Sequence, residues 1–170
     1  MKRPLPKIIL RPLHMDHIGH VMEWVNDPEV MGYFAGCQNR ISFDEERMYM
    51  ESLINSNKDS VSSAFDAETG EYVGQCSINQ IHWPSENGRV FLVVTKKQQG
   101  KGYAEAMLAK LIEIARDSIR LHKLWLIVRE DNDKSLARFV RAGFRIEGVL
   151  RDEYLVGGKY HNMIRMGMIL

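Results

Sequence analysis

The segment Val90-Phe91-Leu92-Val93-Val94, followed shortly by Gln99-Gly100-Lys101-Gly102-Tyr103-Ala104, is the most informative part of this chain of 170 residues. The first run is continuously apolar, which is typical of a buried strand, and an amphipathic stretch begins at Ala104. The glycines therefore lie where a strand turns into a helix. Glycine lets the backbone approach a ligand, and the first N–H groups of a helix lack partners. The pattern predicts a phosphate- or pyrophosphate-binding turn.

Two other phosphate-binding motifs fit this segment less well. A P-loop needs Gly-Lys-Ser/Thr at its end, but Tyr103 follows Gly102 and no hydroxyl is placed for magnesium. A dinucleotide fingerprint needs a small residue where Glu105 stands, although Glu130 and Asp131 do end the next strand. The pattern Q/R-x-x-G-x-G/A is matched completely. For the hexapeptide alone, a glycine-containing turn before a surface helix is the alternative interpretation.

Composition indicates an ordinary globular domain. Apolar residues make up 45% of the chain, charged residues 26%, and the net charge is +1. Nucleic-acid surfaces normally bring a strong basic excess, so no nucleic-acid partner is expected. No apolar run approaches the roughly 20 residues of a membrane helix, and no signal peptide is recognised. We expect one cytoplasmic domain over residues 1–170, without membrane contact. Cys37 and Cys76 form no C-x-x-C pair, so we expect free thiols and no metal site.

The N-terminal half is expected to alternate strands and helices. Residues 7–13 form an opening strand, and a helix follows with Asp16 as its N-cap. Ser42-Phe43-Asp44-Glu45 is a capping-box pattern and predicts a helix that carries Met48, Ser52 and Leu53 toward the core. Residues 61–67 and 72–81 are predicted strands joined by the turn at residues 68–70.

The C-terminal half is expected to contain a βαβ crossover. The helix after the glycine turn has one apolar stripe, made of Ala104, Met107, Leu108, Leu111, Ile112 and Ala115. Residues 124–128 are apolar without alternation, which is typical of a parallel strand buried on both faces. A second helix is expected to turn Leu136, Phe139 and Val140 inward and to end at Gly143. Strands over residues 144–156 and 159–170 would be joined at Gly157-Gly158.

A second polar segment, Arg129-Glu130-Asp131-Asn132-Asp133-Lys134-Ser135, follows the buried strand. Ligands of open α/β sheets bind at the carboxyl ends of strands, so this segment and the glycine turn are expected to face one crevice. Taken alone, Asn132 fits a helix cap as well as a ligand contact.

In this order and spacing, the motifs resemble those of the GNAT superfamily of acetyl-coenzyme A-dependent N-acetyltransferases, in the branch of the RimJ/RimL-type enzymes that acetylate ribosomal-protein N-termini. The resemblance rests on Ile9-Leu10-Arg11-Pro12-Leu13, Trp24-Val25-Asn26-Asp27-Pro28-Glu29-Val30, Gln99 to Ala104, Asn132-Asp133-Lys134-Ser135-Leu136, Ala142-Gly143-Phe144 and Gly158-Lys159-Tyr160. It implies a single α/β (α+β) domain with a mixed sheet of about seven strands, flanking helices and a splayed central parallel strand pair.

The resemblance also implies how acetyl-coenzyme A binds, with no metal. Its pyrophosphate would lie on the amides of Gln99, Gly100, Lys101, Gly102, Tyr103 and Ala104. The backbone of Leu92 and Val94 would hold the pantetheine arm between the splayed strands, and an amide near Leu92 would polarise the thioester carbonyl. Asn132 and Ser135 would contact the arm. Phe139 would pack against the coenzyme or the core.

Two departures from the family pattern affect the proton transfers. Phe139 stands where many relatives have a Tyr that protonates the leaving thiolate, and Arg89 stands where many have a Glu. The thiolate would leave unaided, because a thiol pKa near 8.5 makes it a tolerable leaving group, or with help from Ser135 or water. Glu153, Glu130 and His82 are the candidate bases. Leu92, Ser135 and Glu153 are therefore the predicted catalytic residues.

The resemblance implies acetyl transfer to a primary amine, on a protein N-terminus or on a small molecule such as a polyamine, aminoglycoside or amino sugar. Residues 158–166 are similar to the closing segment of spermidine acetyltransferases. A polycation would need clustered carboxylates, which Glu23, Asp27, Glu29, Glu45 and Glu46 could supply. A non-catalytic coenzyme A-binding regulatory module is the competing hypothesis. A homodimer is one assembly that the resemblance allows.

Overall fold

A seven-stranded sheet, in the order β1-β2-β3-β4-β5-β7-β6, organises the chain. The computed structural model describes residues 4–34 and 39–170. The strands are β1 (Ile8–Pro12), β2 (Ser60–Asp66), β3 (Tyr72–His82), β4 (Asn87–Val94), β5 (Lys123–Arg129), β6 (Arg145–Val156) and β7 (Lys159–Ile169). Only β4 and β5 pair in parallel, and all other neighbours are antiparallel. The expected mixed sheet with a central parallel pair is confirmed.

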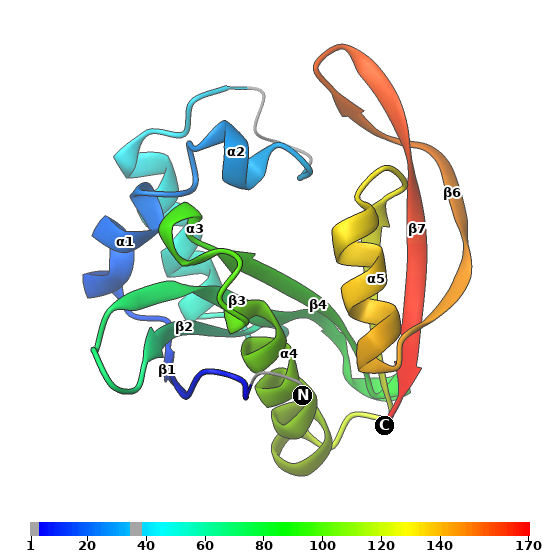
Figure 1. The fold of residues 1–170 in the computed structure, drawn as a ribbon, viewed down its shortest axis with the longest axis horizontal. Coiled ribbons are helices and arrows are strands. Elements are labelled where there is room, and N and C mark those ends of the chain that lie inside the picture. The colour runs from blue at the N-terminus through cyan, green and yellow to red at the C-terminus, as the bar shows by residue number, and fades with distance from the viewer. Residues whose placement is uncertain (1–3, 35–38) are drawn as a thin grey trace.

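Helices cover both faces of this sheet. They are α1 (Ile18–Met22), α2 (Pro28–Met31), α3 (Phe43–Ile54), α4 (Tyr103–Glu113) and α5 (Asp133–Ala142), with short turns at Met15–His17, Trp83–Ser85 and Lys96–Gln98 and a π-helical end at Ile114–Ile119. One core lies under α4 and α5, which stand in front of the sheet in Figure 1. A second core joins α1, α2 and α3 to the opposite face. We call these faces the α4/α5 face and the α1/α3 face.

The start of α3 agrees with the sequence, but its buried stripe does not. The Ser42 hydroxyl accepts the Glu45 N–H and the Glu45 carboxylate accepts the Ser42 N–H, so the capping box is confirmed. Met48, however, is 58% exposed, and the buried residues are Glu46, Met50 and Leu53. The helix turns the stripe at i, i+4 and i+7 toward the sheet, although that stripe contains a carboxylate.

The N-terminal helix begins differently from the expectation. His14, not Asp16, is the N-cap of the turn Met15–His17, where its imidazole accepts the Asp16 N–H. Asp27 then caps the separate helix α2, because Pro28 can occupy a first helical turn but cannot continue a preceding one.

The β4-α4-β5 crossover matches the expectation closely. Every member of the predicted apolar stripe on α4 and its continuation is buried except Ile112, which is partly buried. On β5, Leu124, Leu126 and Val128 are buried on the α4/α5 face, whereas Trp125 and Ile127 are only partly buried. The prediction of burial on both faces was wrong, because α1, α2 and α3 contribute to a core that contains no β5 residue.

The last elements close the sheet with a long hairpin. Gly143 ends α5 at a φ of 103°, and Gly157 and Gly158 form the β6–β7 turn at φ values of 59° and 77°, as predicted. Val140 is 55% exposed rather than inward-facing, because only the Leu136 and Phe139 stripe of α5 meets the core. Cys76 is a buried free thiol whose pKa is raised to about 12 by burial, and Cys37 lies outside the described residues.

Candidate active site

The central parallel strands separate before either strand ends. Their pairing stops at Arg89 and Trp125, although β4 continues to Val94 and β5 to Arg129. The Thr95 N–H bonds to the Val73 carbonyl on the β3 side, 2.9 Å away. Since the N–H and C=O groups of successive strand residues point to opposite edges, those of Leu92 and Val94 point into the gap toward β5. The splay that the family resemblance implied is present, and the backbone groups of Leu92 and Val94 are directed into it.

The glycine turn stands at the open end of this gap. Gly100 and Gly102 have φ values of 77° and 92°, in the left-handed region where glycine is favoured, and Gly102 is the N-cap of α4. The Gln99 side-chain amide donates to the Val94 carbonyl over 3.2 Å, which fixes the turn to the end of β4. The free N–H groups of the first turn of α4 therefore lie beside the splayed strands.

Tyr103 anchors the start of α4 through its side chain. Its hydroxyl donates to Asp66 on β2 over 2.5 Å. This hydrogen bond is the main cause that raises the pKa of Tyr103 to about 12 and lowers the pKa of Asp66 to about 2. Because the hydroxyl is engaged by Asp66, the predicted contact of Tyr103 with a ligand involves its backbone N–H.

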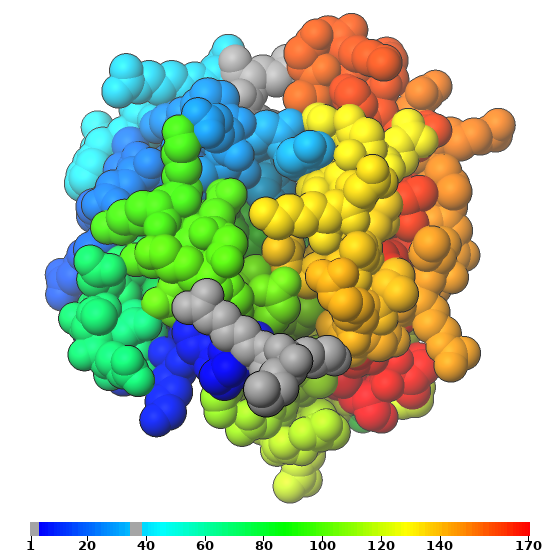
Figure 2. Space-filling view, viewed as in Figure 1, coloured from blue at the N-terminus to red at the C-terminus, as the bar shows by residue number. Residues whose placement is uncertain are grey.

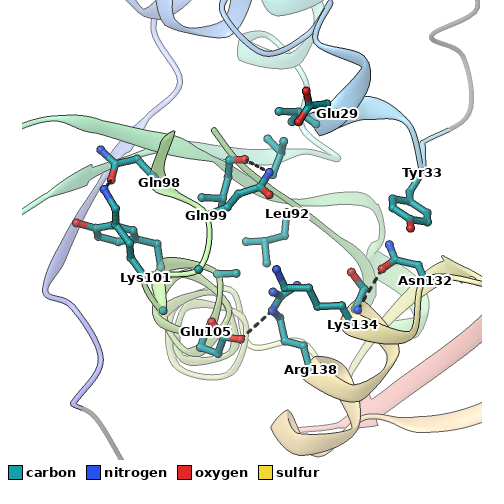
Figure 3. Close-up of a pocket in the computed structure, with 18 of the residues that line it drawn as sticks. Glu29, Tyr33, Leu92, Gln98, Gln99, Lys101, Glu105, Asn132, Lys134 and Arg138 are labelled. Atoms are coloured by element: carbon teal, nitrogen blue, oxygen red, sulfur yellow. Dashed lines mark hydrogen bonds and ion pairs between the residues drawn. The ribbon is translucent and has the colours of Figure 1, made fainter. Parts of the chain in front are cut away.

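A cleft of about 500 Å³ connects the gap and the glycine turn with the start of α5. Figure 3 shows Leu92 at its base, with Gln99 and Lys101 on one side and Asn132 and Lys134 on the other. The predicted coenzyme residues that line it are Leu92, Val94, Gln99, Gly100, Lys101, Gly102, Tyr103, Ala104, Asn132 and Ser135. Figure 2 shows α5 and the segment before α4 facing one another on this side of the molecule.

The α5 wall of the cleft is held by two polar contacts. The Asn132 side-chain oxygen accepts the Ser135 N–H over 3.2 Å, so Asn132 caps α5 as well as lining the cleft. Arg138 on α5 donates to Glu105 on α4 over 3.0 Å, and this ion pair ties the two helices together. Lys101, Lys134 and Arg138 bring three positive charges to the lining, which also contains Glu29 and Glu105.

The remaining predicted residues lie apart from this cleft lining. Phe139 is 8% exposed and packs edge-to-face on Phe144, with 5.7 Å between ring centroids. Glu153 is exposed on β6, and Glu130 accepts the Asn162 side-chain amide over 3.0 Å. His82 is exposed at the end of β3. A coenzyme contact by Phe139 and a proton transfer by any of the other three stay predictions.

Arg89 lies on the α1/α3 face and cannot act as a base. Its guanidinium donates to the Tyr154 hydroxyl over 3.1 Å and lies 5.7 Å from the centroid of the Trp125 ring. Arg165 covers the same ring at 4.0 Å. The residue that replaces the usual Glu therefore belongs to a cation–aromatic cluster on the sheet.

A second cleft, of about 460 Å³, shares the lining residue Phe34 with the first, and no sequence motif predicted it. Its lining comes from the α1–α2 segment, the residues before α3 and the β6–β7 turn: Val25, Asn26, Asp27, Pro28, Met31, Gly32, Phe34, Asn39, Arg40, Val156 and Gly157. Phe34 lines both clefts and packs on Phe91 of β4, with 5.1 Å between ring centroids. The two clefts thus share a wall residue that packs against the splayed part of β4.

Comparison with known proteins identifies the class. Residues 7–145 match the acetyltransferase (GNAT) domain family. This chain therefore belongs to the GNAT acetyltransferases, and it is an acetyl-coenzyme A-dependent N-acetyltransferase. Among the residues that the structure describes, no helix is long and apolar enough to cross a membrane.

Two relatives indicate the branch of this family. The chain is 27% identical to the spermidine N(1)-acetyltransferase of Escherichia coli strain K12 over 157 residues, which cover 92% of this chain and 83% of that protein. It is 24% identical over 160 residues to the Vibrio cholerae enzyme of the same name, with 94% and 91% covered. A crystal structure of spermidine N-acetyltransferase from Vibrio cholerae with CoA and spermine has a TM-score of 0.89, 24% identity and 95% of each chain covered, which confirms the fold.

Proposed function

We propose that the first cleft holds acetyl-coenzyme A, and that a small-molecule primary amine reaches the thioester through the second cleft. The observation that carries this proposal is that Phe34 lines both clefts and packs on Phe91, the neighbour of Leu92 in β4. A volume of about 460 Å³ lies within the range of small-molecule sites. Spermidine is the first acceptor to test, because the two relatives above are named as spermidine acetyltransferases.

Different residues of the first cleft would bind different parts of acetyl-coenzyme A. The amides of Gln99 to Ala104 would receive the pyrophosphate, where the left-handed glycines keep side chains out of the way. The backbone of Leu92 and Val94, directed into the gap, would pair with the amides of the pantetheine arm. Asn132 and Ser135 would contact the same arm from α5.

Acetyl transfer would proceed by direct attack of the amine on the thioester carbonyl. The N–H of Leu92 supplies a fixed donor for the oxygen that gains negative charge in the transition state. The cleft walls hold the two reactants in line, which replaces a bimolecular encounter. The thiolate can leave without a proton donor, because it is only a modest base. The Ser135 hydroxyl lines the cleft and would be the group that protonates the thiolate in place of the missing tyrosine.

The five acids proposed for a polycation site are dispersed in the structure. Glu29 pairs with Lys96 over 2.7 Å, Glu45 belongs to the capping box, and Asp27 caps α2. Glu23 lies beside His20, with 3.9 Å between the nearest charged atoms. Of the five, only Glu46 is buried, and it lines neither cleft, whereas Glu29 lines the first cleft and Asp27 the second.

The test is the release of free thiol from acetyl-coenzyme A with a panel of amines. Spermidine, a peptide with a free N-terminus and an amino sugar represent the three acceptor classes. We expect turnover with spermidine and at least tenfold less with the peptide. Turnover with the peptide alone would contradict the small-molecule assignment. Coenzyme binding without turnover on any amine would favour a regulatory module.

A further inference from the structure

Arg129, the last residue of β5, carries a largely buried charge that the binding of the donor does not use. Its side chain is 13% exposed and donates two hydrogen bonds, of 2.6 and 3.0 Å, to the Asp131 carboxylate. A third N–H donates to the Gly32 carbonyl over 3.0 Å, and the guanidinium lies 4.5 Å from the centroid of the Tyr33 ring. A guanidinium is a rigid planar group with five donors, so it can engage all three partners at once. Arg129 therefore fixes the segment after α2 to the end of β5.

The residues that Arg129 holds belong to both clefts. Gly32 lines the second cleft, Tyr33 lines the first, and Phe34, the next residue, lines both. We call these three residues the shared wall. Phe34 packs on Phe91 of β4, with 5.1 Å between ring centroids. The shared wall is thus attached to β5 through Arg129 and to β4 through Phe34.

Helix α2 and the shared wall span the open end of the splayed strands. Glu29, in the first turn of α2, pairs with Lys96 just after β4 over 2.7 Å, whereas Arg129 holds the other end from β5. Figure 3 shows Glu29 and Tyr33 on the same side of Leu92. Because α2 has only four residues, its own hydrogen bonds contribute little to holding it in place. These two attachments join the ends of β4 and β5, where the strands no longer pair.

The two attachments differ in strength. The Glu29 and Lys96 side chains are 67% and 59% exposed, and ion pairs in that setting contribute little. Arg129 is largely buried and pairs with Asp131 through two parallel bonds, which is the stronger arrangement. The Arg129 carbonyl also accepts the Asn132 N–H over 2.9 Å, in the turn that begins α5. The same residue thus places the shared wall relative to α5, the other wall of the first cleft.

We propose that Arg129 is a positioning residue for acetyl transfer. This inference rests on the proposed function. Arg129 holds the shared wall in place, so that an amine in the second cleft is aligned with the thioester beside Leu92. The donor would be bound by the amides of the glycine turn and the backbone of β4, which the Arg129 side chain does not contact. Loss of the guanidinium should therefore disturb the alignment of the amine and leave coenzyme affinity nearly unchanged.

The experiment compares Arg129→Gln with the wild type, using the amine of the panel that the wild type acetylates fastest. Calorimetric titration with coenzyme A gives the dissociation constant and counts the binding sites. We expect kcat per coenzyme-binding site to fall roughly 10- to 100-fold, because a misplacement of about 1 Å can cost about 100-fold. The dissociation constant should stay within about threefold. Counting the sites separates a loss of alignment from a loss of folded enzyme.

Arg116→Gln is the matched control. Arg116 also makes two hydrogen bonds to a nearby acid, Asp117, at 2.9 and 3.2 Å. It lies in the π-helical segment that follows α4 and lines neither cleft. This variant removes the same kind of pair from a remote place, so its kcat per site should stay within about twofold of the wild type.

A double variant tests whether Arg129 acts through the shared wall. Tyr33→Leu removes the ring that stacks on the guanidinium. If both residues hold the same segment, Arg129→Gln combined with Tyr33→Leu should lower kcat per site by no more than about threefold beyond the more impaired single variant. Losses that multiply would show independent effects and would contradict the proposed role.

The outcomes separate this inference from the proposed function. A kcat per site less than about tenfold below the wild type in Arg129→Gln overturns the Arg129 assignment and leaves the proposed function intact. A parallel loss of coenzyme affinity also overturns it, because the effect would then lie on the donor. An absence of wild-type turnover on every amine overturns both.

Asp131→Ala keeps the inference testable if Arg129→Gln does not fold. The Asp131 side chain is 53% exposed, so its removal should be tolerated, and it deletes the two bonds that orient the guanidinium. A fall in kcat per site of at least about threefold supports the positioning role, and a smaller change overturns it.

Discussion

Gly102→Asp should abolish coenzyme binding, and the structure supplies a matched control for it. Gly102 has a φ of 92°, and a Cβ at this position would lie 3.2 Å from the Pro6 side chain. Gly70, in the β2–β3 turn, has a similar φ of 73° but open space around it and no place in either cleft. A side chain in the left-handed region costs about 1–2 kcal/mol at either site.

The two variants should therefore lose similar stability but differ in affinity. For a domain of this size, about 1–2 kcal/mol lowers Tm by roughly 2–8 °C. At Gly102 the new carboxylate would also face the pyrophosphate. Two like charges about 4 Å apart repel by about 1 kcal/mol in water and about 4 kcal/mol near a protein surface. This range corresponds to a roughly 5- to 700-fold weaker dissociation constant for each phosphate charge.

Calorimetric titration with coenzyme A and thermal unfolding measure the two effects separately. Gly70→Asp should keep the wild-type dissociation constant, whereas Gly102→Asp should weaken it at least tenfold. Gly102→Ala isolates the backbone strain from the charge and should fall between them. A Gly102→Asp protein that binds coenzyme A within twofold of the wild type, with the expected drop in Tm, would refute the assignment of the pyrophosphate to this turn.

Three further variants test the surroundings of the cleft. Asn132→Ala removes the cap on the Ser135 N–H, so it should lower the free energy of unfolding by about 1 kcal/mol and should also weaken coenzyme binding. Asn132→Asp keeps the cap, so calorimetry should show weaker coenzyme binding without the loss of Tm. Phe139→Tyr places a hydroxyl against Phe144 and should lower the free energy of unfolding by about 1–3 kcal/mol while turnover stays within a few-fold; a large gain in kcat would show that a missing acid limits the enzyme. Asp66→Asn should lower Tm at pH 7, and because the folded pKa of about 2 lies below the ordinary 3.8, unfolding scans should show the difference shrinking as pH falls from about 4 through 2.

Local patterns were sufficient to predict the donor side of the site. The apolar run at residues 90–94, the glycines at 100 and 102, and the stripe on α4 are close in sequence, and each has a short-range physical cause. A strand needs an apolar run, a left-handed turn favours glycine, and a helix buries residues at intervals of three and four. These local patterns therefore predicted the turn and the crossover without any knowledge of long-range contacts, whereas the splayed pair was implied by the resemblance to the GNAT superfamily.

The acceptor side of the site was harder to predict, because segments that are distant in the sequence form it. Asn26, Phe34, Arg40 and Gly157 come together only in the folded chain, and α2 is too short to give a periodic signal. The helix after Ser42 shows a second difficulty. An apolar pattern selected Met48 for the core, whereas the structure buries Glu46 at 5% exposure. Hydrophobic patterning assigns charged residues to the surface, so it cannot predict that a carboxylate is buried.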